Sequence, residues 1–199
     1  MAAVDPVAAI LAGSPPATWL FVGDSITQGS KHTEGARSFP QLFEEWVRYE
    51  RGRRDDIVVT TAFSGETTDD LLASFAVRVA RPAPDVVFVM FGTNDATGLV
   101  SEPRFRANLE RIVAQVRALD ALPVLQTPNP IAESGARGAA LAEYVRTIRA
   151  VAADEGVALV DHYRDGEPDL ALLADAIHPN ALGHRTMAER VIGYVATVS

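Results

Sequence analysis

The sequence predicts an α/β protein in which a parallel sheet is covered by helices. Short β-branched, apolar runs alternate along the chain with longer amphipathic stretches, and this alternation is typical of a parallel sheet whose strands are connected by helices. One run, residues 86–91, is apolar at every position, as expected of a central strand that is buried on both faces. With 199 residues, the chain has the usual size of one domain.

The short apolar runs are predicted to be the strands of this sheet. They cover residues 19–22, 57–61, 86–91, 124–127 and 157–160. Ligands of parallel α/β sheets bind at the carboxyl ends of the strands. The residues that directly follow each strand are therefore the first candidates for a functional site.

The amphipathic stretches between the strands are predicted to be helices. The first is capped by Ser38 and ends at Gly52, and the second begins at Thr67 or Thr68 and ends before Pro82. The remaining helices are predicted over residues 103–119, 139–154 and 181–197. Apolar side chains at helical spacing predict that one face of these helices packs against the sheet.

Charge and composition argue against several kinds of partner. The chain has 18 Lys and Arg residues against 26 Asp and Glu residues, a formal net charge of −8. Nucleic acid and anionic membrane surfaces attract basic patches, so neither is expected as the main partner. No apolar run approaches the roughly 20 residues that a membrane-spanning helix needs. The oligomeric state is left open.

A single domain is expected over residues 1–199, with residues 1–17 as an N-terminal extension. The apolar stretch in this extension is preceded by Asp5 and Pro6, and no basic residue follows Met1 directly, which is unlike a secretory signal. A cytoplasmic protein is therefore expected, although trimming from a longer precursor stays open.

The absence of cysteine excludes disulfides, thiolate catalysis and cysteine-ligated zinc. Nucleotide binding on such a sheet also lacks support, because no phosphate-loop pattern and no G-x-G-x-x-G follows a strand.

The first predicted strand leads directly into the segment GDSITQG, residues 23–29. The flanking glycines permit a tight turn that exposes Ser25 at the carboxyl end of the strand. Backbone N–H groups at such a turn can stabilise negative charge on a substrate that the hydroxyl attacks. A serine or Asx turn that only caps a helix explains the same residues.

Two further segments follow strands. Gly65 lies in FSGETTDDLL, after the second strand, where its N–H can approach a ligand, or where it can simply be a loop glycine before a capped helix. Asn94 lies in GTND, after the central strand, and its amide can donate to a developing oxyanion. An Asn-Asp turn is the alternative interpretation of that segment.

The last segment, DAIHP, precedes the final helix. Asp175 stands three residues before His178, so its carboxylate can fold back on one ring nitrogen and leave the other nitrogen free to act as a base. A serine nucleophile needs such a base. Asp95, beside Asn94, is an alternative acid, but Asp175 needs no long-range contact to reach His178. A lone loop histidine before a helix-starting proline is the structural alternative.

Taken together, the four segments GDSITQG, FSGETTDDLL, GTND and DAIHP resemble, in order, the consensus blocks of the SGNH hydrolase family, also called the GDSL esterase and lipase family. The resemblance extends across the whole chain. It implies a three-layer α/β/α sandwich similar to flavodoxin, with strand order 2-1-3-4-5. One departure lies at the second block, where the family often has an asparagine before the glycine and this chain has residues TAF at 61–63.

The resemblance also implies the roles of the site residues. Ser25 is then the nucleophile, His178 the general base and Asp175 its orienting partner. The oxyanion hole is formed by the N–H groups of Ser25 and Gly65 and by the side chain of Asn94. No cofactor and no metal are implied.

The implied reaction is ester hydrolysis through an acyl-enzyme on Ser25, with His178 as the base in both halves. The loops expected to wall the pocket contain no long apolar insertion; they are residues 30–38, 96–102 and 128–138. We therefore predict a small-molecule ester with a short, for example acetyl, acyl group on a polar or carbohydrate alcohol.

Other functions remain compatible with parts of this pattern. An acyltransferase, a longer-chain lipase or a thioesterase would use the same triad. A noncatalytic carbohydrate-binding module could share the fold, but the combination of Ser25, Asn94, Asp175 and His178 argues against it.

Three other histidines are rival candidates for the base, and an arginine-rich segment is a candidate anion site. His32 is expected to be solvated in a polar loop, and His184 to lie on the exposed or capping side of the last helix. His162 follows the fifth strand, so it can line the crevice or be an ordinary loop residue. The segment 48–56, RYERGRRDD, is expected to be a solvated helix end.

Overall fold

The computed structural model describes residues 5–133 and 136–197. Its centre is a five-stranded sheet with the order β2-β1-β3-β4-β5, in which every neighbouring pair is parallel. The strands are β1 (Thr18–Gly23), β2 (Ile57–Thr60), β3 (Val86–Met90), β4 (Leu122–Gln126) and β5 (Ala158–Val160). The predicted α/β fold and the strand order 2-1-3-4-5 are confirmed.

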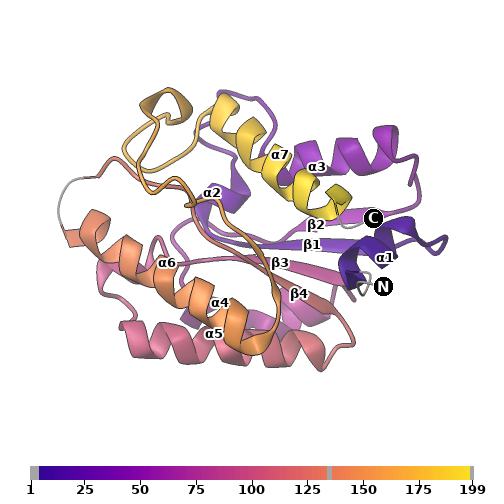
Figure 1. The fold of residues 1–199 in the computed structure, drawn as a ribbon, viewed down its shortest axis with the longest axis horizontal. Helices are drawn as coiled ribbons and strands as arrows, with labels where there is room; N and C mark the ends of the chain where they lie inside the picture. Colours follow the sequence, from indigo (N-terminus) through magenta and orange to yellow (C-terminus); the bar gives the residue numbers. More distant parts are fainter. Residues whose placement is uncertain (1–4, 134–135, 198–199) are drawn as a thin grey trace.

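Helices cover both faces of the sheet and complete a three-layer sandwich (Figure 1). One face carries α1 (Pro6–Ala12), α3 (Phe39–Glu45) and α7 (Ala181–Thr197). The opposite face carries α4 (Thr68–Phe75), α5 (Glu102–Arg117) and α6 (Ala136–Glu155). The short helix α2 (Ser25–Gln28) directly follows β1.

The alternation of side chains along β1 divides the core into two apolar clusters. Leu20 and Val22 point to the cluster beneath α4, α5 and α6, whereas Trp19 and Phe21 point to the cluster beneath α3 and α7. The second cluster is aromatic: the rings of Phe21 and Phe88 stack with centroids 4.5 Å apart. All five residues of β3 are buried, as predicted for a central strand.

Element boundaries differ from the predicted ones by a few residues. β4 begins at Leu122, two residues earlier than predicted, because Leu122 is paired with Val86 at the start of β3. The helices α3 and α4 each continue as a π-helical turn, η1 (Trp46–Glu50) and η2 (Ala76–Ala80). These turns carry the helices on toward Gly52 and Pro82, where the sequence predicts their ends.

The described part of the predicted N-terminal extension contains α1, whereas residues 1–4 lie outside the described residues. Asp5 caps α1 by accepting the N–H of Val7 at 2.8 Å. Val7 and Leu11 are buried in the same apolar cluster as the inner face of α7. These contacts tie the start of the chain to its last helix.

The segment 48–56 was expected to be a solvated helix end, and this is wrong for Arg53 and Asp56. The two side chains form an ion pair of 2.7 Å, and Asp56 also accepts the indole N–H of Trp19 at 2.7 Å. Arg53 donates to the carbonyl groups of Gly13 and Pro15. The segment thus contains a buried ion pair that holds the chain just before β1. The balance of charges in the sequence could not predict this pair.

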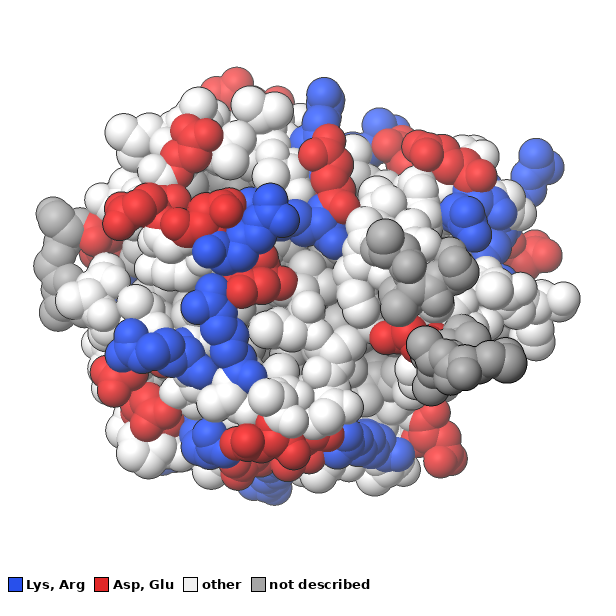
Figure 2. Space-filling view, viewed as in Figure 1, with Lys and Arg blue, Asp and Glu red and all other residues white. Residues whose placement is uncertain are grey.

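The surface shows no separation of charge on the face drawn in Figure 2, where acidic and basic side chains are intermingled. Ion pairs such as Arg190 with Asp165 and Arg149 with Asp161 bring opposite charges together. Within residues 5–133 and 136–197, no helix has the length and apolar character required to span a bilayer.

Candidate active site

Ser25 is the first residue of α2, directly after the carboxyl end of β1. Gly23 makes this placement possible: a Cβ at this position would lie 2.2 Å from Thr27 Oγ1 and 2.7 Å from the carbonyl oxygen of Met90. Only glycine lets α2 pack this closely against β1 and β3. The left-handed residue Gly29, with φ of +62°, then ends the helix after one turn.

Asp24 caps the helix that begins with Ser25. Its Oδ1 accepts the N–H of Ile26 at 2.9 Å, and the side chain is 2% exposed. Burial raises the pKa of Asp24 to about 7, although the hydrogen bond from Ile26 acts in the opposite direction. Asp24 therefore holds the turn rather than serving as a solvated base.

Ser25, His178 and Asp175 form one hydrogen-bonded chain. The hydroxyl oxygen of Ser25 lies 2.9 Å from Nε2 of His178, and Nδ1 of His178 lies 2.9 Å from Oδ2 of Asp175. An ionised carboxylate only accepts hydrogen bonds, so Nδ1 carries the proton and Nε2 is left to accept from Ser25. The geometry permits proton transfer from the hydroxyl to the ring.

Asp175 is held in this orientation by its own loop. Its Oδ1 accepts the backbone N–H groups of Ile177 at 2.8 Å and of His178 at 2.7 Å. Desolvation acts to raise the pKa of Asp175, but these two donors together with the ring of His178 outweigh it and lower the pKa to about 2. The carboxylate therefore stays charged over the whole neutral range.

Asn180, to which the sequence analysis assigns no role, organises the loop that carries His178. Its Oδ1 accepts the N–H groups of Leu182 and Gly183 and so caps α7, while its Nδ2 donates to the carbonyl groups of Ala171 and Leu173. An asparagine directly before a predicted helix is a signal for an N-cap and could have revealed half of this role. The contacts to the preceding loop could not be read from local sequence.

The predicted oxyanion donors lie at the ends of neighbouring strands. Gly65 has a φ of +84°, and a Cβ there would meet nothing within 4 Å, so it borders open space and is required for its backbone conformation. Nδ2 of Asn94 donates to the carbonyl oxygen of Glu66 at 2.9 Å. This bond uses one of the two amide hydrogens and links the segment of Gly65 to that of Asn94.

Asp95 is a structural carboxylate rather than an alternative partner for His178. It is fully buried and accepts the N–H of Thr68 at 3.0 Å, the hydroxyl of Thr68 at 2.7 Å and the N–H of Gly92 at 3.1 Å. Burial raises its pKa despite these donors. Asp95 thereby joins the start of α4 to the end of β3, beneath Gly65 and Asn94.

His32 was expected to be solvated, and this is wrong. Its ring stacks on that of His178 with centroids 3.8 Å apart and an interplanar angle of 9°, and its Nδ1 lies 3.4 Å from Oδ2 of Asp175. Desolvation, and then the neighbouring charge of His178, lower the pKa of His32. The polar loop folds over the site, a long-range contact that the composition of KHTEGAR did not signal.

His184 was expected on the exposed or capping side of α7, and it is buried instead, with 1% exposure. Its Nδ1 accepts the N–H of Phe39, and its ring stacks on that of Phe39. Burial, followed by the charges of His178 and His32, lowers the pKa of His184 to about 4. The side chain therefore links α7 to the start of α3 as a neutral group.

His32, Asp175 and His178 are also the group in the described part of the chain whose ligand atoms lie close enough to hold a metal ion, within 4.8 Å of one another. These side chains already contact each other: Asp175 accepts from Nδ1 of His178 and lies 3.4 Å from Nδ1 of His32. His162 is brought to a separate cavity and does not contact Ser25, His178 or Asp175 in the described residues.

Comparison with known proteins gives one family and several similar chains. The sequence model of the GDSL-like Lipase/Acylhydrolase family matches residues 21–186. An acetylxylan esterase of Geobacillus stearothermophilus is 29% identical over an alignment of 204 positions, which covers 88% of this chain and 93% of that protein. The uncharacterized lipoprotein YqeF of Bacillus subtilis (strain 168) is 35% identical over 125 residues, which cover 58% of this chain.

The match with the lipoprotein spans 49% of that protein, about half of its length. Among solved structures, LAE5, an alpha/beta hydrolase enzyme from the metagenome of Lake Arreo, Spain, superimposes with a TM-score of 0.79 at 25% identity. The superposition covers 95% of this chain and 99% of that chain. The similarity therefore extends over the sheet and both helix layers.

Proposed function

This chain belongs to the GDSL-like lipase/acylhydrolase family, and from that premise we propose that it is a serine esterase of short-chain esters that uses Ser25, His178 and Asp175. As a member of this family it is a carboxylic ester hydrolase. The observation that carries the assignment of residues is the continuous hydrogen-bonded chain from Asp175 through His178 to Ser25.

The first half of the reaction transfers the acyl group to the enzyme. Ser25 Oγ attacks the ester carbonyl while Nε2 of His178 takes the hydroxyl proton. Asp175, charged at neutral pH, stabilises the imidazolium that forms. His178 then returns the proton to the oxygen of the leaving alcohol, and the ester C–O bond breaks.

The second half releases the acid. A water molecule gives a proton to His178 as it attacks the acyl-enzyme, and the proton passes to Ser25 Oγ when the acyl bond breaks. In both halves the negative charge on the carbonyl oxygen is stabilised by the N–H groups of Ser25 and Gly65 and by the free amide hydrogen of Asn94. Donors fixed at the ends of strands need little rearrangement during the reaction.

The proposed substrate is an acetyl or similarly short ester of a polar or carbohydrate alcohol. The relationship to an acetylxylan esterase over 88% of this chain supports this class. The surroundings of the base agree with it, because the polar side chains of His32 and Asp175 lie against the ring of His178. A long acyl chain would leave apolar surface against such groups.

The central test compares wild type with Ser25→Ala for release of p-nitrophenol from p-nitrophenyl acetate. We expect a loss of at least about 10³-fold in kcat in Ser25→Ala and no loss in Ser30→Ala, a matched control at an exposed serine five residues away. A fluorophosphonate should label Ser25 covalently. Equal rates of wild type and Ser25→Ala would contradict the assignment of the nucleophile.

A series of p-nitrophenyl esters from acetate to decanoate tests the acyl group. We expect kcat/KM to be highest for acetate or propionate. A preference for C8 or longer would exclude the short-chain proposal while leaving Ser25 as nucleophile.

A further inference from the structure

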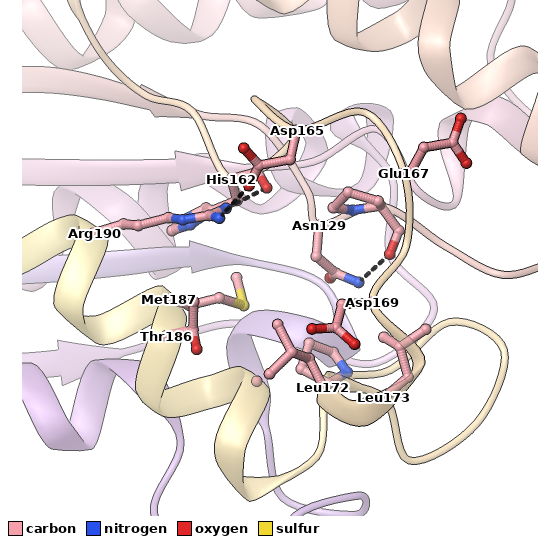
Figure 3. Close-up of a pocket in the computed structure, with 13 residues that line it drawn as sticks. Asn129, His162, Asp165, Glu167, Asp169, Leu172, Leu173, Thr186, Met187 and Arg190 are labelled. Atoms are coloured by element: carbon pink, nitrogen blue, oxygen red, sulfur yellow. Dashed lines mark hydrogen bonds and ion pairs between the residues drawn. The ribbon is translucent and has the colours of Figure 1, made fainter.

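A cavity of about 310 Å³ lies beside the loop that carries His178 (Figure 3). It is bordered by residues after β4 and β5, by α7, and by the loop that passes through η4 (Leu170–Leu172). Parallel sheets bind ligands at this end of their strands. Ser25 is not among the lining residues that the structure describes, so the cavity is separate from the proposed nucleophile.

Asn129 lines this cavity and carries a buried acceptor that is not used. The residue is 8% exposed, and its Nδ2 donates to the carbonyl groups of Pro130 at 2.9 Å and Ile177 at 3.1 Å. Its Oδ1 is buried and has no hydrogen-bond partner among the described residues. A buried acceptor of this kind is stabilised when a ligand donates to it.

His162 supplies a second acceptor. The ring is 1% exposed, and its Nε2 lies 3.0 Å from the amide oxygen of Gln126. Because that oxygen only accepts, Nε2 carries the proton and Nδ1 is the acceptor; Nδ1 has no partner in the described part of the chain. Burial, and then the charge of Arg190, lower the pKa of His162 to about 3, so the ring is neutral.

The charged groups at the cavity also favour a ligand that donates hydrogen bonds. Arg190 is engaged with Asp165 at 2.9 Å and with the carbonyl oxygen of His162 at 2.5 Å. Glu167 and Asp169 add two further carboxylates to the wall. One cation against three carboxylates disfavours an anion such as acetate.

The apolar part of the wall favours a ligand that also has a C–H face. Leu172, Met187 and Pro130 line the cavity between the polar groups, and Figure 3 shows Met187 and Leu172 on opposite sides of the space between α7 and the loop. The volume is near the lower end of the roughly 300–1,000 Å³ found for small-molecule sites. It suits one or two small rings.

We propose that this cavity is a binding site for an uncharged, hydroxyl-rich ligand, namely a sugar ring of the substrate's alcohol part or of the deacetylated product. Its hydroxyl groups donate to Oδ1 of Asn129 and Nδ1 of His162 once small rotations of these two side chains bring the buried acceptors to the cavity surface, and its C–H face packs on Leu172 and Met187. The choice of a sugar rests on the proposed function. The donor–acceptor pattern of the cavity is observed independently of the proposed function.

The site is physically connected to the catalytic loop. Asn129 donates to the carbonyl oxygen of Ile177, the residue before His178, and Pro179, the residue after it, lines the cavity. A sugar bound to Asn129 therefore rests against the segment that positions the base.

Calorimetric titration with xylobiose, which carries no ester, tests the proposal on the wild-type protein. We expect saturable binding that is at least about tenfold weaker in Leu172→Trp and Thr186→Phe, which fill the cavity from opposite walls. Leu170→Trp is the matched control, because Leu170 belongs to the same turn but is 70% exposed. Thermal unfolding verifies that each variant is folded.

The four histidines allow a second readout by nitrogen NMR of the imidazole rings. Xylobiose should shift the Nδ1 resonance of His162, and the shift should be lost in Leu172→Trp but kept in Leu170→Trp. No saturation in wild type, or equal binding in both filled variants and the control, overturns the proposal. Binding of ethylammonium in place of xylobiose would make the cavity a cation site and also overturns it.

Failure here and failure of the esterase proposal give different results. Xylobiose should bind equally to wild type and Ser25→Ala, because Ser25 does not line the cavity. If xylobiose does not bind but p-nitrophenyl acetate is hydrolysed, the sugar site is excluded and the esterase assignment is kept. If xylobiose binds but p-nitrophenyl acetate is not hydrolysed, the esterase assignment is excluded and the sugar site is kept.

Discussion

Ser25 and His178 belong to two walls of the site that are held in place by different kinds of structure. The strand-end wall (Ser25, Gly65 and Asn94) follows β1, β2 and β3 and lies over the buried carboxylates of Asp24 and Asp95. The loop wall (Asp175 and His178) stands on a segment held by hydrogen bonds between side chains and backbone, many of them made by Asn180.

The same residue type behaves in opposite ways in the two walls. Asp24 is 2% exposed, and burial raises its pKa to about 7. The side chain of Asp175 is 43% exposed, and its donors lower its pKa to about 2. The carboxyl group of Asp24 thus holds a turn at the strand-end wall. The carboxylate of Asp175 in the loop wall instead stays negatively charged beside the base.

The largest expected effect comes from the loop wall. Asp175→Asn should lower kcat for p-nitrophenyl acetate by about 10⁴-fold, because an amide no longer fixes the tautomer of His178 or stabilises the imidazolium. The control is Asp154→Asn, a 63% exposed carboxylate on α6, which should retain wild-type kcat. If Asp175→Asn stays within tenfold of wild type, the loop wall does not supply the charge proposed here.

The next effect is on stability and belongs to the strand-end wall. Asp24 has a pKa of about 7 in the folded protein against its ordinary value of 3.8, so unfolding releases its proton between about pH 4 and pH 7. Its contribution is therefore present below about pH 4 and is lost as the pH rises through 7. Asp24→Asn keeps an acceptor for Ile26 but cannot ionise.

We expect Asp24→Asn to raise the melting temperature at pH 8, by an amount corresponding to as much as about 4 kcal/mol, and to have little effect at pH 4. Thermal melts of both proteins across this range measure it. A variant that is less stable than wild type at pH 8 would show that the ionised carboxylate is favoured in the fold.

The contrast between the walls also explains how far the sequence could predict the site. The strand order and the places of Ser25, Gly65 and Asn94 follow from short segments directly after strands, where local sequence and topology agree. Such positions depend on residues within a few places of each other.

The parts that sequence did not predict depend on contacts across the chain. His32 reaches Asp175 over a long separation, His184 is turned inward toward Phe39, and the cavity beside His162 is closed by a loop whose path has no periodic pattern. Polar composition predicted exposure for His32, and the last helix predicted an exposed or capping position for His184. These predictions failed because neutral imidazoles with a partner can be buried among other rings.

A smaller effect on activity is expected at the strand-end wall. Asn94→Ala should lower kcat for p-nitrophenyl acetate by about 10²-fold to 10³-fold with little change in KM, because its amide donates more strongly to the oxyanion than to the substrate carbonyl. Labelling by a fluorophosphonate should slow in parallel. An unchanged kcat would leave the backbone N–H groups of Ser25 and Gly65 as the oxyanion donors.

The smallest effect is expected at His32, whose ring lies against the loop wall. Phe in this position keeps a ring against His178 but removes the ionisable nitrogen beside Asp175. The pKa of His32 is lowered from 6.5, so His32 is neutral at pH 8 and His32→Phe should change kcat/KM by less than about threefold there.

His32→Ala should lower kcat at pH 8, because the stacked ring that limits the motion of His178 is lost. If His32→Phe and His32→Ala have the same kcat at pH 8, stacking does not position the base, and the loop of Asp175 alone holds it.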